Sequence, residues 1–341
     1  MARLRRTDLS GPCLTRRRHG RGFTYYNGAG ARITDPATLA RIRALVIPPA
    51  WRDVWICPYP DGHIQAVGTD AAGRRQYRYH DDWRAERDRE KHEHALDFAQ
   101  RLPHLREMVC ARMAGRGLTR ERVLATAVRL LDIGFFRLGS EEYAEENETF
   151  GIATLLREHV TCSRDAVTFE YPAKGSKQRE QAVVEPDVRR VLLALKRRPG
   201  GGAELLAYRN AVGWHDVRSE DINGYLREII GNGFTAKDFR TWHATVLAAV
   251  ALAVSTRVPL GTAGRKRAVV RAVKEVAEYL GNTPAVARAS YIDPRVIELY
   301  EEGVTVAPAL GLLGEEAEYG ELATQGPVEE AVLKLLRGTA A

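Results

Sequence analysis

The hydrophobic period changes once along this chain, near Asp82, and the change limits the folds that it can adopt. Before that point β-forming residues dominate, and two turn signals, Asn27-Gly28 and Asp61-Gly62, predict hairpins. After it, apolar residues recur with a helical period. We therefore expect an α+β protein in which a small β-rich domain precedes a larger, mostly helical one.

The same change predicts where the domains end. We place a β-rich N-terminal domain at 1–82 and a mostly helical domain at 83–303. An acidic, partly helical C-terminal tail follows at 304–341, where VEEAVLKLLRG has a helical pattern.

Within the helical domain, one short β segment interrupts the pattern. The stretch AVTFEYPAKGSKQREQAVV predicts a hairpin whose turn lies near Lys174–Ser176. In LTRERVLATAVRLLDIG the apolar residues share one helical face, and Gly134 supplies a C-terminal stop. Further helices are predicted at 186–198, 219–230, 236–256, 265–281 and 284–302.

The net charge of +7 is unevenly distributed. Residues 1–90 hold 17 Lys and Arg against 10 Asp and Glu, and residues 91–300 hold 32 against 26. Residues 301–341 hold 2 against 8. A basic surface attracts polyanions such as DNA, because phosphate contacts release counterions. Charge alone is equally compatible with a solvated, Arg-rich surface.

Several classes of protein do not fit this sequence. It has no apolar run long enough to span a bilayer and no secretory signal, and its four cysteines form no CxxC pair, so we expect a cytoplasmic protein. The triplet His92-Glu93-His94 is a poor metal site, because i and i+2 side chains of a helix point apart. Without a nucleotide or metal motif, we expect no cofactor.

Five residues of the helical domain are candidates for chemistry on a phosphate, although each has an ordinary structural explanation. An arginine at a helix end commonly binds carbonyl groups, a lysine at a hairpin tip is usually solvated, and a helical tyrosine is usually a core residue. The five are Arg137, Lys174, Arg240, Asn282 and Tyr291.

Four motifs together resemble type IB DNA topoisomerases of the poxvirus and small bacterial kind. RLGSEEYAEENETFG at 137–151 is similar to their arginine–ENETxG signature, and KDFRTWHAT at 237–245 resembles their KDxRT box. SYID at 290–293 resembles their tyrosine box, and GRRQYRYH at 73–80 resembles a groove-contacting segment of their N-terminal domain. The order and spacing agree over most of the chain.

The resemblance implies a role for each of the five candidates. Tyr291 would be the nucleophile that forms a 3′-phosphotyrosyl bond, and Arg137 and Arg240 would bind the scissile phosphate. Lys174 would protonate the departing 5′-oxygen. Asn282 stands where poxvirus-type members have a histidine, and we expect it to donate a hydrogen bond to the phosphate.

The resemblance also implies residues that bind duplex DNA, and it leaves one assignment open. Ala173 stands where the family usually has a glycine, so either Lys174 or Lys177 could be the acid, with Lys174 favoured by its place in the hairpin. Trp242 and His243 are expected to pack within the protein or to support the site. The implied DNA contacts are Gln76, Tyr77, Tyr79, Tyr143 and Lys237.

The implied function is relaxation of positive and negative supercoils without ATP or metal, by a nucleoid-associated monomer. One alternative is a tyrosine site-specific recombinase, but its His-x-x-Arg box would need a histidine where Lys237 stands, and its N-terminal domain is normally helical. The other alternative is a non-catalytic DNA-binding protein, which the chemically competent residues at all five positions argue against.

Overall fold

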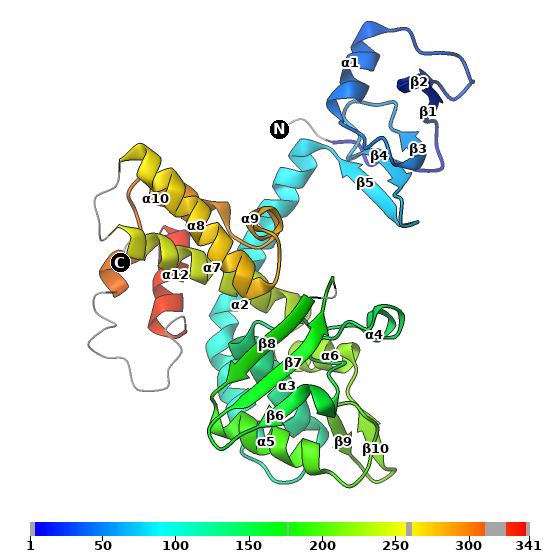
Figure 1. The fold of residues 1–341 in the computed structure, drawn as a ribbon. Coiled ribbons are helices and arrows are strands. Elements are labelled where there is room, and N and C mark those ends of the chain that lie inside the picture. The colour runs from blue at the N-terminus through cyan, green and yellow to red at the C-terminus, as the bar shows by residue number, and fades with distance from the viewer. Residues whose placement is uncertain (1–3, 176, 257–260, 311–324, 339–341) are drawn as a thin grey trace. The chain divides into compact units, whose positions relative to one another are not determined.

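The computed structural model describes residues 4–175, 177–256, 261–310 and 325–338 (Figure 1). Its contacts form two compact units, Met1–Lys91 and His92–Ala341. The division falls within helix α2 (Asp81–Met113). The predicted α+β class is confirmed, with strands in the first unit and mainly helices in the second. No helix in the described part of the chain is long and apolar enough to cross a membrane.

The first unit contains an antiparallel five-stranded sheet in the order β2-β1-β3-β4-β5, a short helix and the first turns of α2. Its core contains Leu14, Ile42 and Ile56. Helix α1 (Pro36–Ala44) contributes Ile42 and was not predicted; it begins after Asp35, whose carboxylate accepts a hydrogen bond from a backbone amide. The strands are β1 (Leu14–His19), β2 (Gly22–Tyr26), β3 (Arg52–Ile56), β4 (Ile64–Thr69) and β5 (Arg75–Tyr79).

Of the two predicted turns, one joins paired strands and the other does not. Gly62 lies in the connection between the antiparallel strands β3 and β4, as expected. The β1–β2 hairpin instead turns before Gly22, which pairs with His19. The Asn27 side chain accepts hydrogen bonds from the amides of Ala29 and Ala31, so that it closes a local loop after β2 instead of a two-stranded turn.

The second unit packs its helices around one large apolar core and a three-stranded sheet in the order β6-β7-β8. The predicted hairpin is confirmed, because β7 and β8 pair from Val167–Val183 to Ala173–Lys177. A small β9–β10 pair was not predicted. The strands are β6 (Val160–Cys162), β7 (Val167–Ala173), β8 (Lys177–Val183), β9 (Ala207–Arg209) and β10 (Trp214–Asp216).

Most predicted helices of this unit agree with the structure within a few residues. In addition to α2, the helices are α3 (Arg120–Gly134), α4 (Glu141–Asn147), the 3₁₀ helix η1 (Arg157–His159), α5 (Pro186–Arg197), α6 (Ser219–Ile230), α7 (Ala236–Ser255), α8 (Thr262–Leu280), α9 (Pro284–Ser290), α10 (Pro294–Glu301) and α12 (Pro327–Arg337).

The helix predicted at 284–302 is wrong, because the structure divides it in two. Helix α9 ends at Ser290 and α10 begins at Pro294. A proline lacks the amide hydrogen for a helical bond, and it disfavours helical geometry in the preceding residue, here Asp293. Asp293 instead caps α10 by accepting a hydrogen bond from the Arg295 amide. The break leaves Tyr291 at the end of a helix instead of inside one.

A buried group of charges joins α2, α3 and α12. The carboxylate of Asp132 accepts two hydrogen bonds of 2.9 Å from Arg106 and a third, also 2.9 Å, from Arg129. Arg106 also donates to Glu329 on α12. Burial by itself would raise the pKa of the Asp132 carboxyl, but His243 and Arg106 lower it below its ordinary value.

Replacing Asp132 with asparagine should strongly destabilise the second unit. Arg106 would keep only Glu329, and Arg129 only Glu185, as a carboxylate partner. Part of this buried positive charge would then be uncompensated, a loss of up to about 3–5 kcal/mol. Asp187→Asn is the matched control, since it breaks an exposed pair with Arg190. Urea denaturation at pH 7, followed by circular dichroism, measures both.

The pH dependence of this loss follows from the lowered pKa of Asp132. A carboxyl group whose pKa is lower in the folded state stabilises the fold above its unfolded pKa of ~3.9. That stabilisation declines as the pH falls toward the folded pKa. The stability difference between the wild type and Asp132→Asn should therefore be complete at pH 7 and shrink below about pH 4. A difference that stays constant down to pH 3 would contradict the assignment.

Candidate active site

Three consecutive carbonyl groups at the end of α8 each accept a hydrogen bond from a different guanidinium group. The last carbonyls of a helix have no partner within it and carry the negative end of its dipole, so cations bind there. Gly281 ends α8 in the left-handed conformation, with φ of 62°. The pairs are Arg179 with Tyr279 (3.1 Å), Arg240 with Leu280 (2.9 Å) and Arg137 with Gly281 (2.9 Å).

Arg137 reaches this position from the segment that follows α3. Gly134 was predicted to stop the helix, and it is the last helical residue, but the left-handed conformation belongs to Phe135, with φ of 52°. A Cβ atom on Gly134 would lie 2.3 Å from the ring of Phe136. The glycine is therefore required for close packing, while Phe135 turns the chain toward the site.

The two ends of the RLGSEEYAEENETFG segment meet behind Arg137. The Arg137 carbonyl accepts a 2.8 Å hydrogen bond from the amide of Ile152. A Cβ atom on Gly151 would lie 2.4 Å from the backbone nitrogen of Gly139, whose φ is 82°. Since these backbones touch, both positions need glycine. This contact fixes the backbone from which the Arg137 side chain extends.

Asn282 lies directly after α8, and Arg137 sets the orientation of its amide. Nη2 of Arg137 donates to Oδ1 of Asn282 over 2.5 Å. Because a guanidinium group can only donate, Oδ1 faces Arg137 and Nδ2 faces away. Nδ2 is buried and has no hydrogen-bond partner in the described structure. The side chain thus offers a donor, which is what a phosphate oxygen needs.

Arg240 extends from the first turns of α7 and is 6% exposed. Besides the Leu280 carbonyl, it reaches the Phe135 carbonyl at 3.4 Å. Burial, and then repulsion by Arg137, lower the pKa of Arg240 to about 10. The guanidinium group therefore stays charged at neutral pH, and a bound anion would relieve its unfavourable surroundings.

Tyr291 lies beside Arg240 at the break between α9 and α10. The guanidinium carbon of Arg240 is 5.1 Å from the centre of the tyrosine ring. Burial would raise the pKa of the Tyr291 hydroxyl, but the charges of Arg240, Arg137 and Lys237 lower it below its ordinary value. The surrounding positive charge therefore makes this tyrosine easier to ionise than a free tyrosine.

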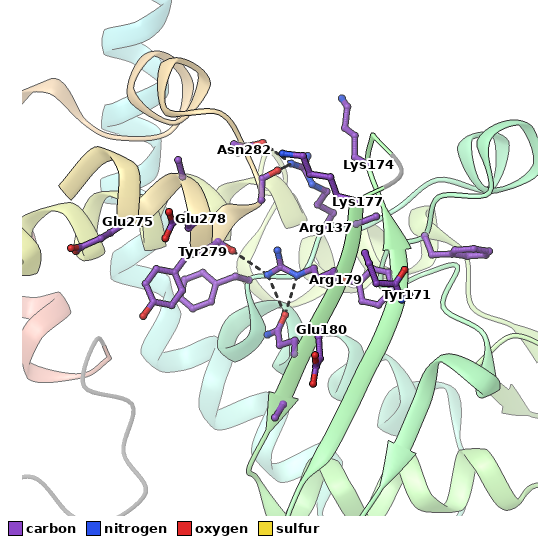
Figure 2. Close-up of a pocket in the computed structure, with 18 of the residues that line it drawn as sticks. Arg137, Tyr171, Lys174, Lys177, Arg179, Glu180, Glu275, Glu278, Tyr279 and Asn282 are labelled. Atoms are coloured by element: carbon purple, nitrogen blue, oxygen red, sulfur yellow. Dashed lines mark hydrogen bonds between the residues drawn. The ribbon is translucent and has the colours of Figure 1, made fainter. Parts of the chain in front are cut away.

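The β7–β8 hairpin forms one wall of a cavity of about 840 Å³ that Arg137, Arg179 and Asn282 also line (Figure 2). Lys174 and Lys177 lie at its tip and are exposed. Figure 2 shows the Lys174 side chain pointing away from Arg137. Arg240 and Tyr291 do not line this cavity. The structure thus brings four of the five predicted residues close together, and Lys174 lies at the rim of the cavity. The four are Arg137, Arg240, Asn282 and Tyr291.

Two residues of this hairpin line the site but were not predicted from the sequence. Arg179 lies on β8 two positions after Lys177, and residues i and i+2 of a strand share one face. That spacing was the available signal. Tyr171 pairs with Arg179 across the strands, is 1% exposed and also lines the cavity. Burial raises the pKa of its hydroxyl. The cavity is also lined by the carboxylates Glu180, Glu275 and Glu278.

Other predicted residues of this unit lie in different surroundings. Lys237 is exposed in the first turn of α7. Trp242 and His243 are buried, as expected: the indole of Trp242 donates to Glu329, and His243 lies 3.6 Å from Asp132. Tyr143 lies on α4, and its side chain is outside the described residues.

In the first unit, the predicted DNA contacts lie on β5. The rings of Tyr77 and Tyr79 are stacked, with centres 6.0 Å apart, and both are more than a third exposed. Gln76 belongs to the other face, because side chains alternate along a strand, and it donates to Asp70. These three residues therefore do not form one surface, whereas the tyrosine pair does.

The geometry of the second unit suits chemistry on a phosphodiester. Fixed guanidinium groups and an unpaired amide donor can stabilise the charge of a pentacoordinate phosphorus, and an activated tyrosine can attack it. Among the described residues, no group of three or more His, Cys, Asp or Glu side chains could hold a metal ion.

Comparison with known proteins identifies two segments of the chain. A family model described as the catalytic core of eukaryotic DNA topoisomerase I matches residues 80–305. A second model, the N-terminal domain of bacterial DNA topoisomerase IB, matches residues 22–70.

Three named relatives agree with these matches. DNA topoisomerase 1B of Acanthamoeba polyphaga mimivirus is 30% identical over 298 residues, 84% of this chain and 87% of the relative. DNA topoisomerase 1B of vaccinia virus (strain Copenhagen) is 22% identical over 69% of this chain and 72% of its own length. DNA topoisomerase 1 of Schizosaccharomyces pombe is 32% identical over 38% of this chain, but only 15% of its own length is matched.

These matches favour a topoisomerase over both a tyrosine recombinase and a non-catalytic DNA-binding protein. One model spans more than half of the chain, and the mimivirus relative is similar over most of both sequences. The chain therefore belongs to the type IB DNA topoisomerase family.

Proposed function

We propose that this topoisomerase relaxes positive and negative supercoils by cleaving and rejoining one DNA strand through Tyr291, without ATP or a metal ion. The observation that carries the proposal is the position of the Tyr291 ring, beside the buried guanidinium group of Arg240. Arg137 and Asn282 complete a group of fixed donors. Together these residues supply a nucleophile and positive charge for a phosphodiester.

In the cleavage step, the Tyr291 oxygen attacks the phosphorus and loses its proton. A bond forms between the tyrosine oxygen and phosphorus, and the bond between phosphorus and the 5′-oxygen breaks. The product is a 3′-phosphotyrosyl bond and a free 5′-hydroxyl. The covalent bond retains the energy of the phosphodiester, so rejoining requires no ATP.

Arg137, Arg240 and the Nδ2 group of Asn282 hold the non-bridging phosphate oxygens during this step. Without DNA, the two guanidinium groups repel each other, and a phosphate between them relieves this repulsion. The three donors therefore stabilise the phosphate most strongly in the transition state, where its negative charge increases. Asn282 cannot titrate, and it acts in this proposal by hydrogen-bond donation alone. Arg179 adds a third guanidinium group, placed for an adjacent phosphate.

The departing 5′-oxygen takes its proton from Lys174. Because the Lys174 side chain points away from Arg137 (Figure 2), the hairpin tip must reorient when DNA binds. Lys177, also at the tip, remains the alternative acid.

For the rest of the chain, we propose that residues 1–82 bind duplex DNA through Tyr77 and Tyr79, and that Gln76, Tyr143 and Lys237 add contacts. Residues 83–303 form the catalytic domain. The enzyme acts as a monomer in the cytoplasm, on the nucleoid. The exposed stacked pair of tyrosines on an edge strand supports the DNA contact.

Tyr291→Phe should bind duplex DNA with unchanged affinity and form no covalent adduct, because only the nucleophilic oxygen is lost. Gel shift with a labelled duplex measures binding, and denaturing gels measure the adduct. Tyr208→Phe, on the distant strand β9, is the control and should cleave normally. Adduct formation by Tyr291→Phe would assign the nucleophile to another residue.

Lys174→Ala should cleave at least a hundredfold more slowly, since the 5′-oxygen would leave unprotonated. A substrate with sulfur at the 5′-bridging position has a better leaving group and should recover most of the rate. Single-turnover cleavage of both substrates by Lys174→Ala and Lys177→Ala makes the comparison. Recovery by sulfur in Lys177→Ala alone would move the acid to that residue.

Relaxation in the presence of EDTA should be first order and independent of enzyme concentration once every plasmid is bound. Free rotation about the intact strand requires one protein per cleavage, and torsion in the DNA drives it for either sign of supercoil. Rapid-quench assays on positively and negatively supercoiled plasmids provide the rates. Sigmoidal dependence on protein would contradict the monomer, and loss of activity in EDTA would contradict the metal-free mechanism.

A further inference from the structure

Helix α12 lies beyond the part of the chain that matches the family's catalytic core, yet it is built into the core of the second unit. The family match ends at residue 305, and α12 begins at Pro327. Val328, Val332 and Leu336 belong to the main apolar core. Figure 1 draws α12 in red near α7, and residues of the two helices are in contact. This part of the acidic tail is therefore a structural component of the unit.

The same helix inserts one carboxylate, Glu329, into that core. Glu329 is 7% exposed. One oxygen accepts from the indole of Trp242 over 2.8 Å, and Arg106 donates to both oxygens over 2.5 and 3.1 Å. The backbone amide of Gly326 also donates to this carboxylate, over 3.1 Å. A buried carboxylate with four such hydrogen bonds is held tightly, because removing any partner leaves a polar group without compensation.

These contacts hold the part of helix α7 that carries Arg240. Trp242 and His243 follow Arg240 on α7 by two and three residues, so they point to different sides of the helix. Glu329 holds the side of Trp242, and His243 lies 3.6 Å from Asp132. The rotation of α7, which aims the Arg240 guanidinium group at the Leu280 carbonyl, is thus set partly from the C-terminal helix.

We propose that Glu329 is a positioning residue for cleavage, which acts through Trp242 on the placement of Arg240. This inference rests on the proposed function, since it needs Arg240 to bind the scissile phosphate. Helix α12 is then a working part of the catalytic domain. Glu329 itself does not touch DNA, and its removal alters the rate of the covalent step more than the affinity for DNA.

The decisive experiment compares Glu329→Ala with Glu330→Ala at saturating enzyme. Glu330 is on the same helix but is exposed and pairs with Lys334. We expect single-turnover cleavage of a labelled duplex to slow about tenfold in Glu329→Ala and to be unchanged in Glu330→Ala. The dissociation constant for DNA should change less than twofold in both. Glu329→Gln keeps an oxygen acceptor for Trp242 and should recover part of the rate.

Trp242→Phe keeps the proposal testable if Glu329→Ala folds poorly. It removes the indole donor, keeps an aromatic ring and leaves the pairing of Glu329 with Arg106. We expect about threefold slower cleavage, and the double variant should be no slower than Glu329→Ala alone, since both act through the same hydrogen bond. All rates are measured below the melting temperature of each variant.

The outcomes separate this inference from the proposed function. Normal cleavage by folded Glu329→Ala or Trp242→Phe, or slowing that multiplies in the double variant, would overturn the positioning role. Slowing matched by an equal loss of DNA affinity would also overturn it. If the wild type itself formed no adduct at Tyr291, the proposed function would fail first.

Discussion

The C-terminal end of helix α8 organises the active site. Its carbonyls at Tyr279, Leu280 and Gly281 are free because a helix cannot pair its last acceptors, and each binds a guanidinium group from a different element. Arg137 comes from the loop after α3, Arg179 from β8 and Arg240 from α7. The left-handed Gly281 ends the helix where these side chains converge. One helix end therefore brings three mutually repelling cations close together.

This arrangement explains how a site can hold so much positive charge before its substrate binds. Carbonyl dipoles offset part of the repulsion among the arginines. Unlike a carboxylate, they do not neutralise the positive charge. The pKa of Arg240 falls only to about 10, so it stays charged, and its charge lowers the pKa of Tyr291. Two buried carboxylates, Asp132 and Glu329, pair instead with Arg106, and these pairs join helices α2, α3 and α12. Carbonyl partners thus leave arginines charged at the active site, whereas carboxylate partners stabilise the packing of helices.

Local pattern was enough for most of the fold and failed where a side chain or a packing contact competed with it. The period change near residue 82, the hairpin with its turn at Lys174 and the helix at 219–230 were predicted, since each depends on neighbours in sequence. The hairpin turn predicted at Asn27-Gly28 was wrong, because the Asn27 side chain closes a local loop instead. The single helix expected at 284–302 was wrong, because Pro294 disfavours helical geometry at Asp293 and so interrupts the helical period. Phe135 adopts a left-handed conformation that favours glycine, which propensity does not predict.

The sequence by itself determined the types of element and, through four short motifs, the residues of the candidate site. It could not determine that Arg137 meets Asn282, 145 positions later. Nor could it determine that Arg179 reaches the Tyr279 carbonyl or that Glu329 reaches the indole of Trp242. A motif records neighbours along the chain, whereas these contacts arise from the packing of elements that are far apart in it. Only tertiary structure places the end of α8 against three arginines and α12 against Trp242, because burial of the shared core decides which helix ends and faces meet.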